Sequence, residues 1–376
     1  MTSTMVRFKA SRIVLGLTMA LMLVLALPVL ALAQGTWTLQ TVGAGDGLWR
    51  VTCADSTHCW ASGFGGQIQF SNGSGTWTPE TSGVSVDLFG ISCPDATHCW
   101  VVGRTGTILF STGNGTWTPQ TSGTTENLFG VDCPDTTHCW AVGSSSTALF
   151  STGTGTWTPQ TVPANTVLEG VSCPDLTHCW ASGATSPNAA AILFTDGTGT
   201  WTAQAAPATT NDILYDISCA DDTHCSAVGA TIISLRNGTW STDTAPAGFG
   251  YDGVSCPDAT HCWAAGGGGG SGVNAILFTT GDGTWVSQDP GGMERLLGIF
   301  MLSACSGYAV GQDEEQTTNA VAAYSDPCAT PSASGSAAPT LPQAGHPASP
   351  PALWWLLLAL VAPAAAALAF LRQRRT

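Results

Sequence analysis

Two cysteines and one histidine recur together in six copies of a short motif. Four copies read CPDxTHCW and two are looser; they begin at Cys53, Cys93, Cys133, Cys173, Cys219 and Cys256. These side chains could bind zinc, or the two cysteines of each copy could form a disulfide. A structural zinc site needs four ligands, usually with two to four residues between cysteines, whereas each copy offers two cysteines five residues apart. The spacing therefore favours disulfides, and no metal site or cofactor is predicted.

The spacing also suits a short β-hairpin. Cysteines on either side of a five-residue turn face each other, with α-carbons about 4.5–5.5 Å apart, and disulfides accept about 4.4–6.8 Å. The chain has 14 cysteines, and the last two are left to pair with each other. The predicted bridges are Cys53–Cys59, Cys93–Cys99, Cys133–Cys139, Cys173–Cys179, Cys219–Cys225, Cys256–Cys262 and Cys305–Cys328.

A histidine precedes the second cysteine of every copy. The simplest interpretation is a turn histidine bonded to nearby backbone. Because histidine gains its charge near pH 6.5, a pH-sensing ring of six histidines is the alternative. They are His58, His98, His138, His178, His224 and His261.

The motif belongs to a longer repeat of about 40 residues, a period typical of β-propeller blades. The tripeptide Gly-Thr-Trp occurs seven times in the same register. Within one repeat, turn residues separate four apolar segments that have strand character, at Asp87–Cys93, Cys99–Gly103, Thr107–Thr112 and Thr116–Thr121. The last contains Pro119, which predicts an edge strand.

The two ends of the repeat region are complementary. Gly35–Thr41 has the sequence of a fourth strand without its blade, and the last unit, which ends near Asp326, has no fourth strand. The N-terminal strand can therefore complete the last blade. We predict an all-β fold, a seven-bladed β-propeller of four-stranded repeats with one disulfide per blade. Both tryptophan series, those of Gly-Thr-Trp and of the hairpins, are expected to pack between blades.

Three segments carry a family resemblance over Gly35 to about Asp326. They are PDTTHCWAVG (Pro134–Gly143), GTILFST (Gly106–Thr112) and TDGTGTW (Thr195–Trp201). They resemble the propeller repeats of photosystem II stability/assembly factor-like proteins and, more distantly, the BNR/Asp-box repeats of sialidases. The resemblance implies a propeller fold and, weakly, a role in assembly or glycoside hydrolysis.

Both ends of the chain have the composition of targeting segments. Residues 1–33 combine early basic residues, an apolar run and an Ala-Leu-Ala site, which predicts a secretory signal peptide. The ectodomain is expected at 34–328, followed by a Pro/Ala/Ser-rich spacer at 329–351. Residues 352–371 are long and apolar enough for a transmembrane helix, and the basic tail at 372–376 is expected in the cytoplasm.

The spacer contains a pentapeptide that resembles a sortase signal. Leu341, Pro342, Gln343, Ala344 and Gly345 precede the apolar segment and basic tail in the order of LPxTG-type substrates, with alanine in the usual threonine position. This order predicts a bacterial protein that is anchored in the cell wall. Retention as a single-pass membrane protein, with its C-terminus in the cytoplasm, is the alternative.

Charge limits the classes of partner. The chain carries a net charge of −15, and all 25 acidic residues lie between the two apolar ends. That region contains only four cations, Arg50, Arg104, Arg236 and Arg295. A strongly negative field excludes nucleic acid as a partner. The acidity either serves solubility or binds calcium.

Positions that break the repeat locate a candidate site. The second and third residues of each unit's first strand should face the central channel, and glycine dominates the third position. Arg50 and Asp216 stand there instead. The candidate ligand-binding residues at the channel mouth are Trp49, Arg50, Phe89, Phe129, Tyr215, Asp216 and Asp252. Aromatic rings with few polar groups suit sugars or peptides; alternatively, these rings only pack between blades.

The sequence therefore predicts a monomeric, extracellular binding or scaffold module for a protein or glycan. A structural surface-layer component is the first alternative. A sialidase-like glycosidase is the second, and it is disfavoured because hydrolysis of that kind needs several converging arginines. No enzymatic activity is expected.

Overall fold

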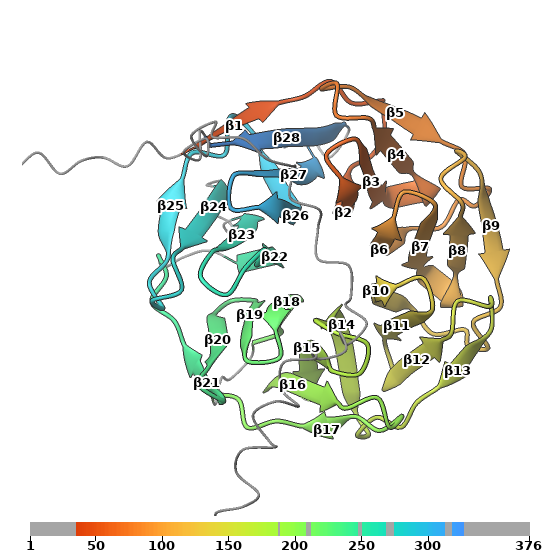
Figure 1. Cartoon of the computed structure of the whole chain (residues 1–376), viewed down its shortest axis with the longest axis vertical. Helices are drawn as coiled ribbons and strands as arrows, with labels where there is room; N and C mark the ends of the chain where they lie inside the picture. Colours follow the sequence, from red (N-terminus) through yellow and green to blue (C-terminus); the bar gives the residue numbers. More distant parts are fainter. Residues whose placement is uncertain are drawn as a thin grey trace, which may run out of the picture. The chain divides into compact units, whose positions relative to one another are not determined.

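Seven four-stranded sheets make up the described part of this computed structural model, which covers residues 35–186, 189–207, 212–246, 250–267, 274–312 and 318–326. All strand pairs within the sheets are antiparallel. In this part of the chain, helix is limited to two short 3-10 turns, η1 (Phe64–Gly66) and η2 (Arg104–Gly106). Figure 1 shows the sheets arranged as blades around a common centre. The predicted seven-bladed propeller is confirmed.

Each blade runs outward from the channel in chain order. Blade 1 contains β2 (Leu48–Asp55), β3 (His58–Gly63), β4 (Ile68–Ser71) and β5 (Trp77–Glu80). Blade 2 contains β6 (Leu88–Asp95), β7 (His98–Gly103), β8 (Ile108–Ser111) and β9 (Trp117–Gln120). Blade 3 contains β10 (Leu128–Asp135), β11 (His138–Gly143), β12 (Thr147–Ser151) and β13 (Trp157–Pro159). Blade 4 contains β14 (Thr166–Ser172), β15 (Cys179–Thr185), β16 (Ala189–Thr195) and β17 (Thr202–Ala203).

The other three blades follow the same plan. Blade 5 contains β18 (Asp216–Asp221), β19 (His224–Val228), β20 (Ile232–Arg236) and β21 (Thr239–Thr242). Blade 6 contains β22 (Gly250–Ser255), β23 (Cys262–Gly267), β24 (Asn274–Thr279) and β25 (Val286–Gln288). Blade 7 contains β26 (Arg295–Ser303), β27 (Ser306–Gln312), β28 (Asn319–Ser325) and, as its outer strand, β1 (Thr36–Leu39).

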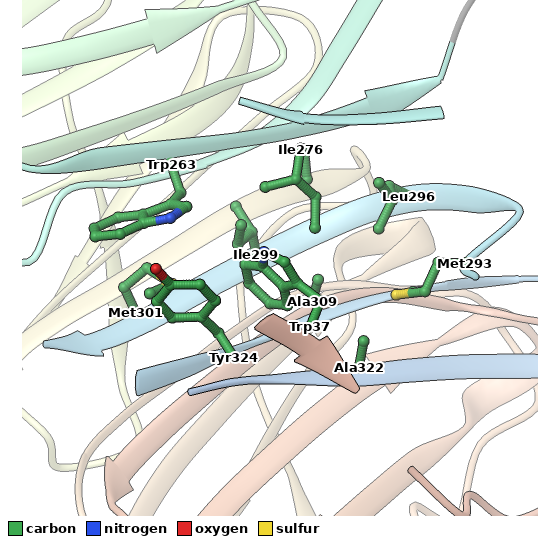
Figure 2. Close-up of a cluster of buried hydrophobic side chains, with 11 residues drawn as sticks. Trp37, Trp263, Ile276, Met293, Leu296, Ile299, Met301, Ala309, Ala322 and Tyr324 are labelled. Atoms are coloured by element: carbon green, nitrogen blue, oxygen red, sulfur yellow. The ribbon is translucent and has the colours of Figure 1, made fainter. Parts of the chain in front are cut away.

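The two ends of the propeller sequence meet in blade 7. β1 pairs with β28 in antiparallel register, with Thr36 opposite Ser325. Figure 2 shows the core behind this closure, where Trp37 of β1 and Tyr324 of β28 lie beside Trp263 of blade 6. The ring centroids of Trp37 and Tyr324 are 4.9 Å apart, and those of Trp263 and Tyr324 are 5.7 Å apart. Closure therefore buries aromatic surface from both ends of the propeller, as the sequence predicted.

Both series of tryptophans pack between blades. Trp100 of blade 2 is fully buried in one cluster with Leu128, Val131 and Trp157 of blade 3. The same arrangement recurs with Trp140 and Trp201 at the next junction. Burial of a large aromatic side chain contributes several kcal/mol, roughly 3–5 by the cost of truncation. These contacts stabilise the ring, and the expected packing role is confirmed.

A second set of contacts links the blades at the outer rim. The indole N–H of the Gly-Thr-Trp tryptophan donates to an amide or carboxylate oxygen of the preceding blade; Trp157 Nε1 lies 2.8 Å from Gln120 Oε1. Five parallel threonine bridges, such as Thr121 with Thr156, connect neighbouring outer strands. In the described part, the junction of blades 4 and 5 lacks both contacts. Trp240 Nε1 is buried there without a partner, and no threonine bridge joins the two outer strands.

Six of the predicted cysteine pairs are disulfides in the described structure. The six C-x5-C pairs form disulfides with α-carbons 4.0–4.2 Å apart, shorter than expected and closest to the narrow spacing of a non-hydrogen-bonded strand pair. The seventh predicted bridge, Cys305–Cys328, includes a residue outside the described part. Among the described residues, no group of three or more His, Cys, Asp or Glu could hold a metal ion.

The turn histidines bond to a side chain rather than to backbone. In each of the six turns, Nδ1 of the histidine lies 2.6–3.0 Å from the aspartate three residues earlier. The same aspartate accepts the threonine backbone N–H between them, as Asp175 does from Thr177. Burial raises the pKa of Asp175, but hydrogen bonds from His178 and Thr177 outweigh burial and lower this pKa to about 2.

The expected targeting segments lie outside the described residues. These are the signal peptide (1–33), the spacer with Leu341, Pro342, Gln343, Ala344 and Gly345, the apolar segment (352–371) and the basic tail. Within the described ranges, no helix is long and apolar enough to cross a membrane.

Candidate functional site

The site forms where the seven inner strands begin, at one end of the central channel. An inner strand starts beside the end of its partner, as in the pair Leu48 with Gly63, and it ends at the cysteine turn. The beginnings of the inner strands and the cysteine turns therefore lie on opposite faces of the propeller. We call the end at which the inner strands begin the channel mouth.

A bulge in the inner strand turns one extra residue toward the channel. In β2, Leu48 pairs with Gly63 and Arg50 pairs with Ser62, so Trp49 between them has no partner across the ladder. β6 and β10 skip Phe89 and Phe129 in the same way. A bulged residue is free to point away from the sheet face. The repeat therefore brings a side chain to the mouth from each of these three blades.

These side chains enclose a cavity of about 250 Å³, which we call the mouth cavity. Its lining residues are Trp49, Arg50, Phe89, Phe129, Glu169, Tyr215 and Asp252. Six of the seven occupy the same position of the repeat, directly after a buried residue that is Leu48, Leu88, Leu128, Leu168, Leu214 or Tyr251. The blade 7 residue at that position, Leu297, is instead buried, with 1% of its surface exposed.

Blades 1 to 3 give the cavity an aromatic side. The ring centroids of Trp49 and Phe89 are 5.7 Å apart in an edge-to-face arrangement, and those of Phe89 and Phe129 are 5.4 Å apart. Phe64 of η1 supports Trp49 from behind at 4.9 Å. The guanidinium carbon of Arg104 lies 5.7 Å from the Phe89 ring centroid. These contacts hold the rings as a contiguous arc.

Blades 4 to 6 give the cavity an acidic side. Glu169 and Asp252 flank Tyr215, whose surface is 38% exposed. Burial raises the pKa of Glu169, although Arg50 partly offsets this rise. Burial likewise raises the pKa of Asp252 to about 6 against the opposing effects of Arg50 and Arg295. Both carboxylates are therefore short of solvent, and a cation beside them would favour their charged forms.

Arg50 crosses the channel below the cavity. Its Nη1 donates to the carbonyl oxygen of Leu297 in blade 7 at 2.8 Å, and its Nη2 donates to that of Tyr215 in blade 5 at 3.2 Å. Its Nε lies 3.9 Å from a carboxylate oxygen of Asp216. One arginine thus ties three blades together across the axis. Contact between Arg50 and a ligand stays a prediction, because these partners already engage most of its donors.

Asp216 lies beneath this arginine rather than in the cavity lining. It also accepts backbone N–H groups from Ile217 and from Val254 of the next blade. The other third-position residues are glycines because the neighbouring strand lies too close. A β-carbon on Gly298 would lie 2.5 Å from the carbonyl oxygen of Trp49, and one on Gly90 would lie 2.9 Å from that of Phe129. Glycine at the third position therefore allows neighbouring inner strands to approach each other closely.

The sequence interpretation missed two features. Glu169 lines the cavity although it was not among the candidate residues. The sequence signal that could have found it is the repeat position that it shares with Phe89 and Phe129. A ring of inter-blade hydrogen bonds was also missed. Ser172 Oγ accepts the backbone N–H of Cys219 at 3.0 Å, and Ser218 Oγ accepts that of Cys256 at 2.9 Å. A hydroxyl residue before the first cysteine of most repeats is the sequence signal for this ring.

Blade 3 places a carboxylate in that ring. Asp132 accepts the backbone N–H of Cys173 at 2.7 Å, and Ser92 Oγ donates to it at 3.3 Å. Burial raises the pKa of Asp132 to about 6, despite these hydrogen bonds. Asp132 is thus a third carboxylate, with Asp216 and Asp252, whose pKa is raised by burial.

The fold and site define a seven-bladed β-propeller with an aromatic and acidic channel mouth. No family model and no curated protein sequence matches the chain. Solved structures do match. YCF48 bound to D1 peptide has a TM-score of 0.61 at 17% identity, covering 80% of this chain and 100% of that chain. YCF48 from Cyanidioschyzon merolae has a TM-score of 0.60 at 18% identity, covering 76% and 98%.

Propellers of other kinds are equally similar. The structure of U3-55K has a TM-score of 0.64 at 10% identity and covers 77% of this chain and 98% of its own. At such low identities the likeness shows the fold alone. Propellers of this kind commonly serve as protein-binding scaffolds.

Proposed function

We propose that this protein is a rigid binding module that holds a protein partner at the channel mouth. The observation that carries the proposal is the mouth cavity itself. Six blades each deliver the same repeat position to it, and those positions differ in chemistry from blade to blade. Packing alone would favour one apolar residue throughout, as at Leu297.

The size of the cavity favours a protein over a free small molecule or glycan. Sites that enclose a whole small ligand measure about 300–1,000 Å³, and this cavity measures about 250 Å³. It suits one anchoring side chain of a larger partner, the usual form of an interface hot spot. A structurally similar propeller, YCF48, has been solved with a bound peptide, which supports this mode of binding.

We further propose that the module is displayed outside the cell on a wall or membrane anchor. The support is the sequence of both chain ends and the chemistry of the blades. Six structural disulfides suit an oxidising compartment. The LPQAG pentapeptide and apolar segment would then provide the attachment.

Binding rather than hydrolysis is also part of the proposal. A sialidase-like site needs several arginines that converge on one carboxylate. Arg50 lies in the channel, whereas Arg104 pairs with Asp87 at 2.6 Å and Arg236 pairs with Asp243 at 2.7 Å in a different blade. Each of these three arginines is already held by protein groups, so they do not provide that arrangement.

The test is affinity capture with the immobilised full-length protein, using secreted and wall proteins of the host. Phe89→Ala/Phe129→Ala removes two rings of the mouth cavity. Leu176→Ala is the control, because Leu176 is 38% exposed in a cysteine turn on the opposite face. We expect a partner that the control retains and the double variant loses. Identical captured proteins from both variants would contradict the proposal.

A further inference from the structure

The two carboxylates on the acidic side of the mouth cavity are not bonded to any of the described residues. Glu169 and Asp252 line the cavity, yet among these residues no hydrogen bond or ion pair of either carboxylate is found. The aspartates of the cysteine turns differ, since each is bonded to a threonine and a histidine. Carboxylates that are partly buried without a partner are costly unless something completes them.

Two arginines act on these carboxylates without bonding to them: Arg50 favours the charged form of both, and Arg295 favours that of Asp252. The guanidinium of Arg50 is held by the carbonyl oxygens of Leu297 and Tyr215, with Asp216 at 3.9 Å. Asp216 balances its charge. Within the described residues, neither Arg50 nor Arg295 forms an ion pair with Glu169 or Asp252, so both carboxylates remain available to a cation that enters the cavity.

The aromatic side adds a second attraction for positive charge. The faces of Trp and Phe rings carry negative potential, and a cation within about 6 Å of a ring centroid is attracted by about 0.5–2 kcal/mol. Phe89 already shows this chemistry toward Arg104, at 5.7 Å. Rings on one side and carboxylates on the other form a cup that complements a cation on an apolar stem.

We propose that the mouth cavity binds a cationic side chain, a lysine ammonium or an arginine guanidinium, that projects from the partner protein. The inference rests on the proposed function and specifies the chemistry of the anchor. The stem of such a side chain would lie along Phe89 and Phe129, and its charge would meet Glu169 and Asp252. Anionic and uncharged polar anchors would lack this complementarity.

The experiment measures binding of four blocked tripeptides to the full-length protein by ligand-observed NMR. The peptides are acetyl-Gly-X-Gly-amide with lysine, arginine, norleucine or citrulline at X. Norleucine and citrulline keep the shape of the two cationic side chains but remove the charge. We expect the cationic peptides to bind at least about tenfold more tightly than their neutral counterparts. The stronger of the two identifies the anchor as lysine or arginine.

Two matched variants test the carboxylates. Glu169→Gln/Asp252→Asn should weaken the cationic peptides at least about tenfold and leave norleucine unchanged. Glu126→Gln/Asp46→Asn removes the same charge outside the cavity, where Glu126 accepts hydrogen bonds from Ser144 and Ser145. This control should leave all four peptides unchanged. If both double variants lost the same affinity for the cationic peptides, only the overall negative charge of the protein would be acting. That result would overturn the inference.

Other outcomes separate this inference from the proposed function. If the cationic and neutral peptides bind equally, or none binds, the cup is not a cation site and the inference fails. The proposed function survives that result when Phe89→Ala/Phe129→Ala still loses the captured partner. It fails only when that double variant captures what the Leu176→Ala control captures.

Discussion

Blades 3 and 5 have the same strand plan but differ in what fills the space beside their second strands. In blade 3, Trp140 is 1% exposed and its ring centroid lies 4.9 Å from that of Phe150. In blade 5, Ser226 and Ser234 occupy these two positions, with their hydroxyls 2.9 Å apart. The backbone pairing is alike in both blades, so the sheet itself does not require the aromatic pair.

A polar network replaces the missing aromatic volume in blade 5. Ser234 Oγ donates to Asp243 at 2.8 Å, and Arg236 forms two bonds of 2.7 and 2.8 Å with the same carboxylate. Trp285 of blade 6 also donates to Asp243. The comparison teaches that a blade can give up this aromatic pair when the hydroxyl groups that replace it are hydrogen-bonded. Blade 5, the blade that departs most, also supplies Tyr215 and Asp216 to the channel.

The largest expected effect comes from removing the tryptophan of blade 3 without supplying the polar network that blade 5 has. Trp140→Ser should lower the free energy of unfolding by about 3–5 kcal/mol, since it leaves Phe150 and the blade 4 core facing a void. Urea unfolding followed by circular dichroism measures this loss. Ser226→Ala at the same position of blade 5 is the control and should cost about 1 kcal/mol. Equal losses would mean that the aromatic pair does not stabilise blade 3.

The second prediction concerns the carboxylate that only blade 3 places in the inter-blade hydrogen-bond ring. Burial raises the pKa of Asp132 to about 6, so the folded state binds this proton more tightly than the unfolded state. Stability from this group is therefore present below about pH 4 and is lost as pH rises through about 6. Asp132→Ser, the residue found in blades 4 to 6, removes that dependence.

The stability of Asp132→Ser relative to the parent should therefore increase between pH 4 and pH 7, by on the order of 2–3 kcal/mol. Urea unfolding of both proteins across this range measures the difference, and other titrating groups cancel between them. A constant difference would show that Asp132 does not change its charge there.

The smallest expected effect concerns the hydrogen bond at the outer rim, which Trp157 of blade 3 makes and Trp240 of blade 5 lacks in the described part. Gln120→Leu removes the acceptor of Trp157 Nε1 and should cost about 1 kcal/mol. Gln204→Leu in blade 4 is the matched control, because Gln204 bonds to Thr202 and leaves Trp240 Nε1 without a partner in the described part. Its change should stay within about 0.5 kcal/mol. A larger loss in the control would remove the rim bond as an explanation.

The repeat made most of the fold predictable. Strand order, blade number, closure by Gly35–Thr41 and six disulfides follow from positions that recur, because each blade solves the same packing problem. The candidate site was predictable only in part. Position in the repeat selects Phe89, Phe129 and also Glu169, which the candidate set left out although it included Asp252 at the same repeat position.

Contacts made by residues that break the repeat could not be predicted. Arg50 of blade 1 reaches Tyr215 of blade 5 across the axis. No period connects these two residues, and only the closed ring brings them together. The same holds for Asp243, whose three partners come from blades 5 and 6.

Site-specific photo-crosslinking tests the central claim, that the channel mouth is where the partner binds. A benzophenone amino acid replaces Tyr215 at the mouth or Leu176 on the opposite face, two residues that are each 38% exposed. The full-length protein is then irradiated with the host's wall and secreted proteins. Our account predicts a discrete adduct from position 215 and none from position 176. An adduct from position 176 alone, or equal adducts from both, would contradict it.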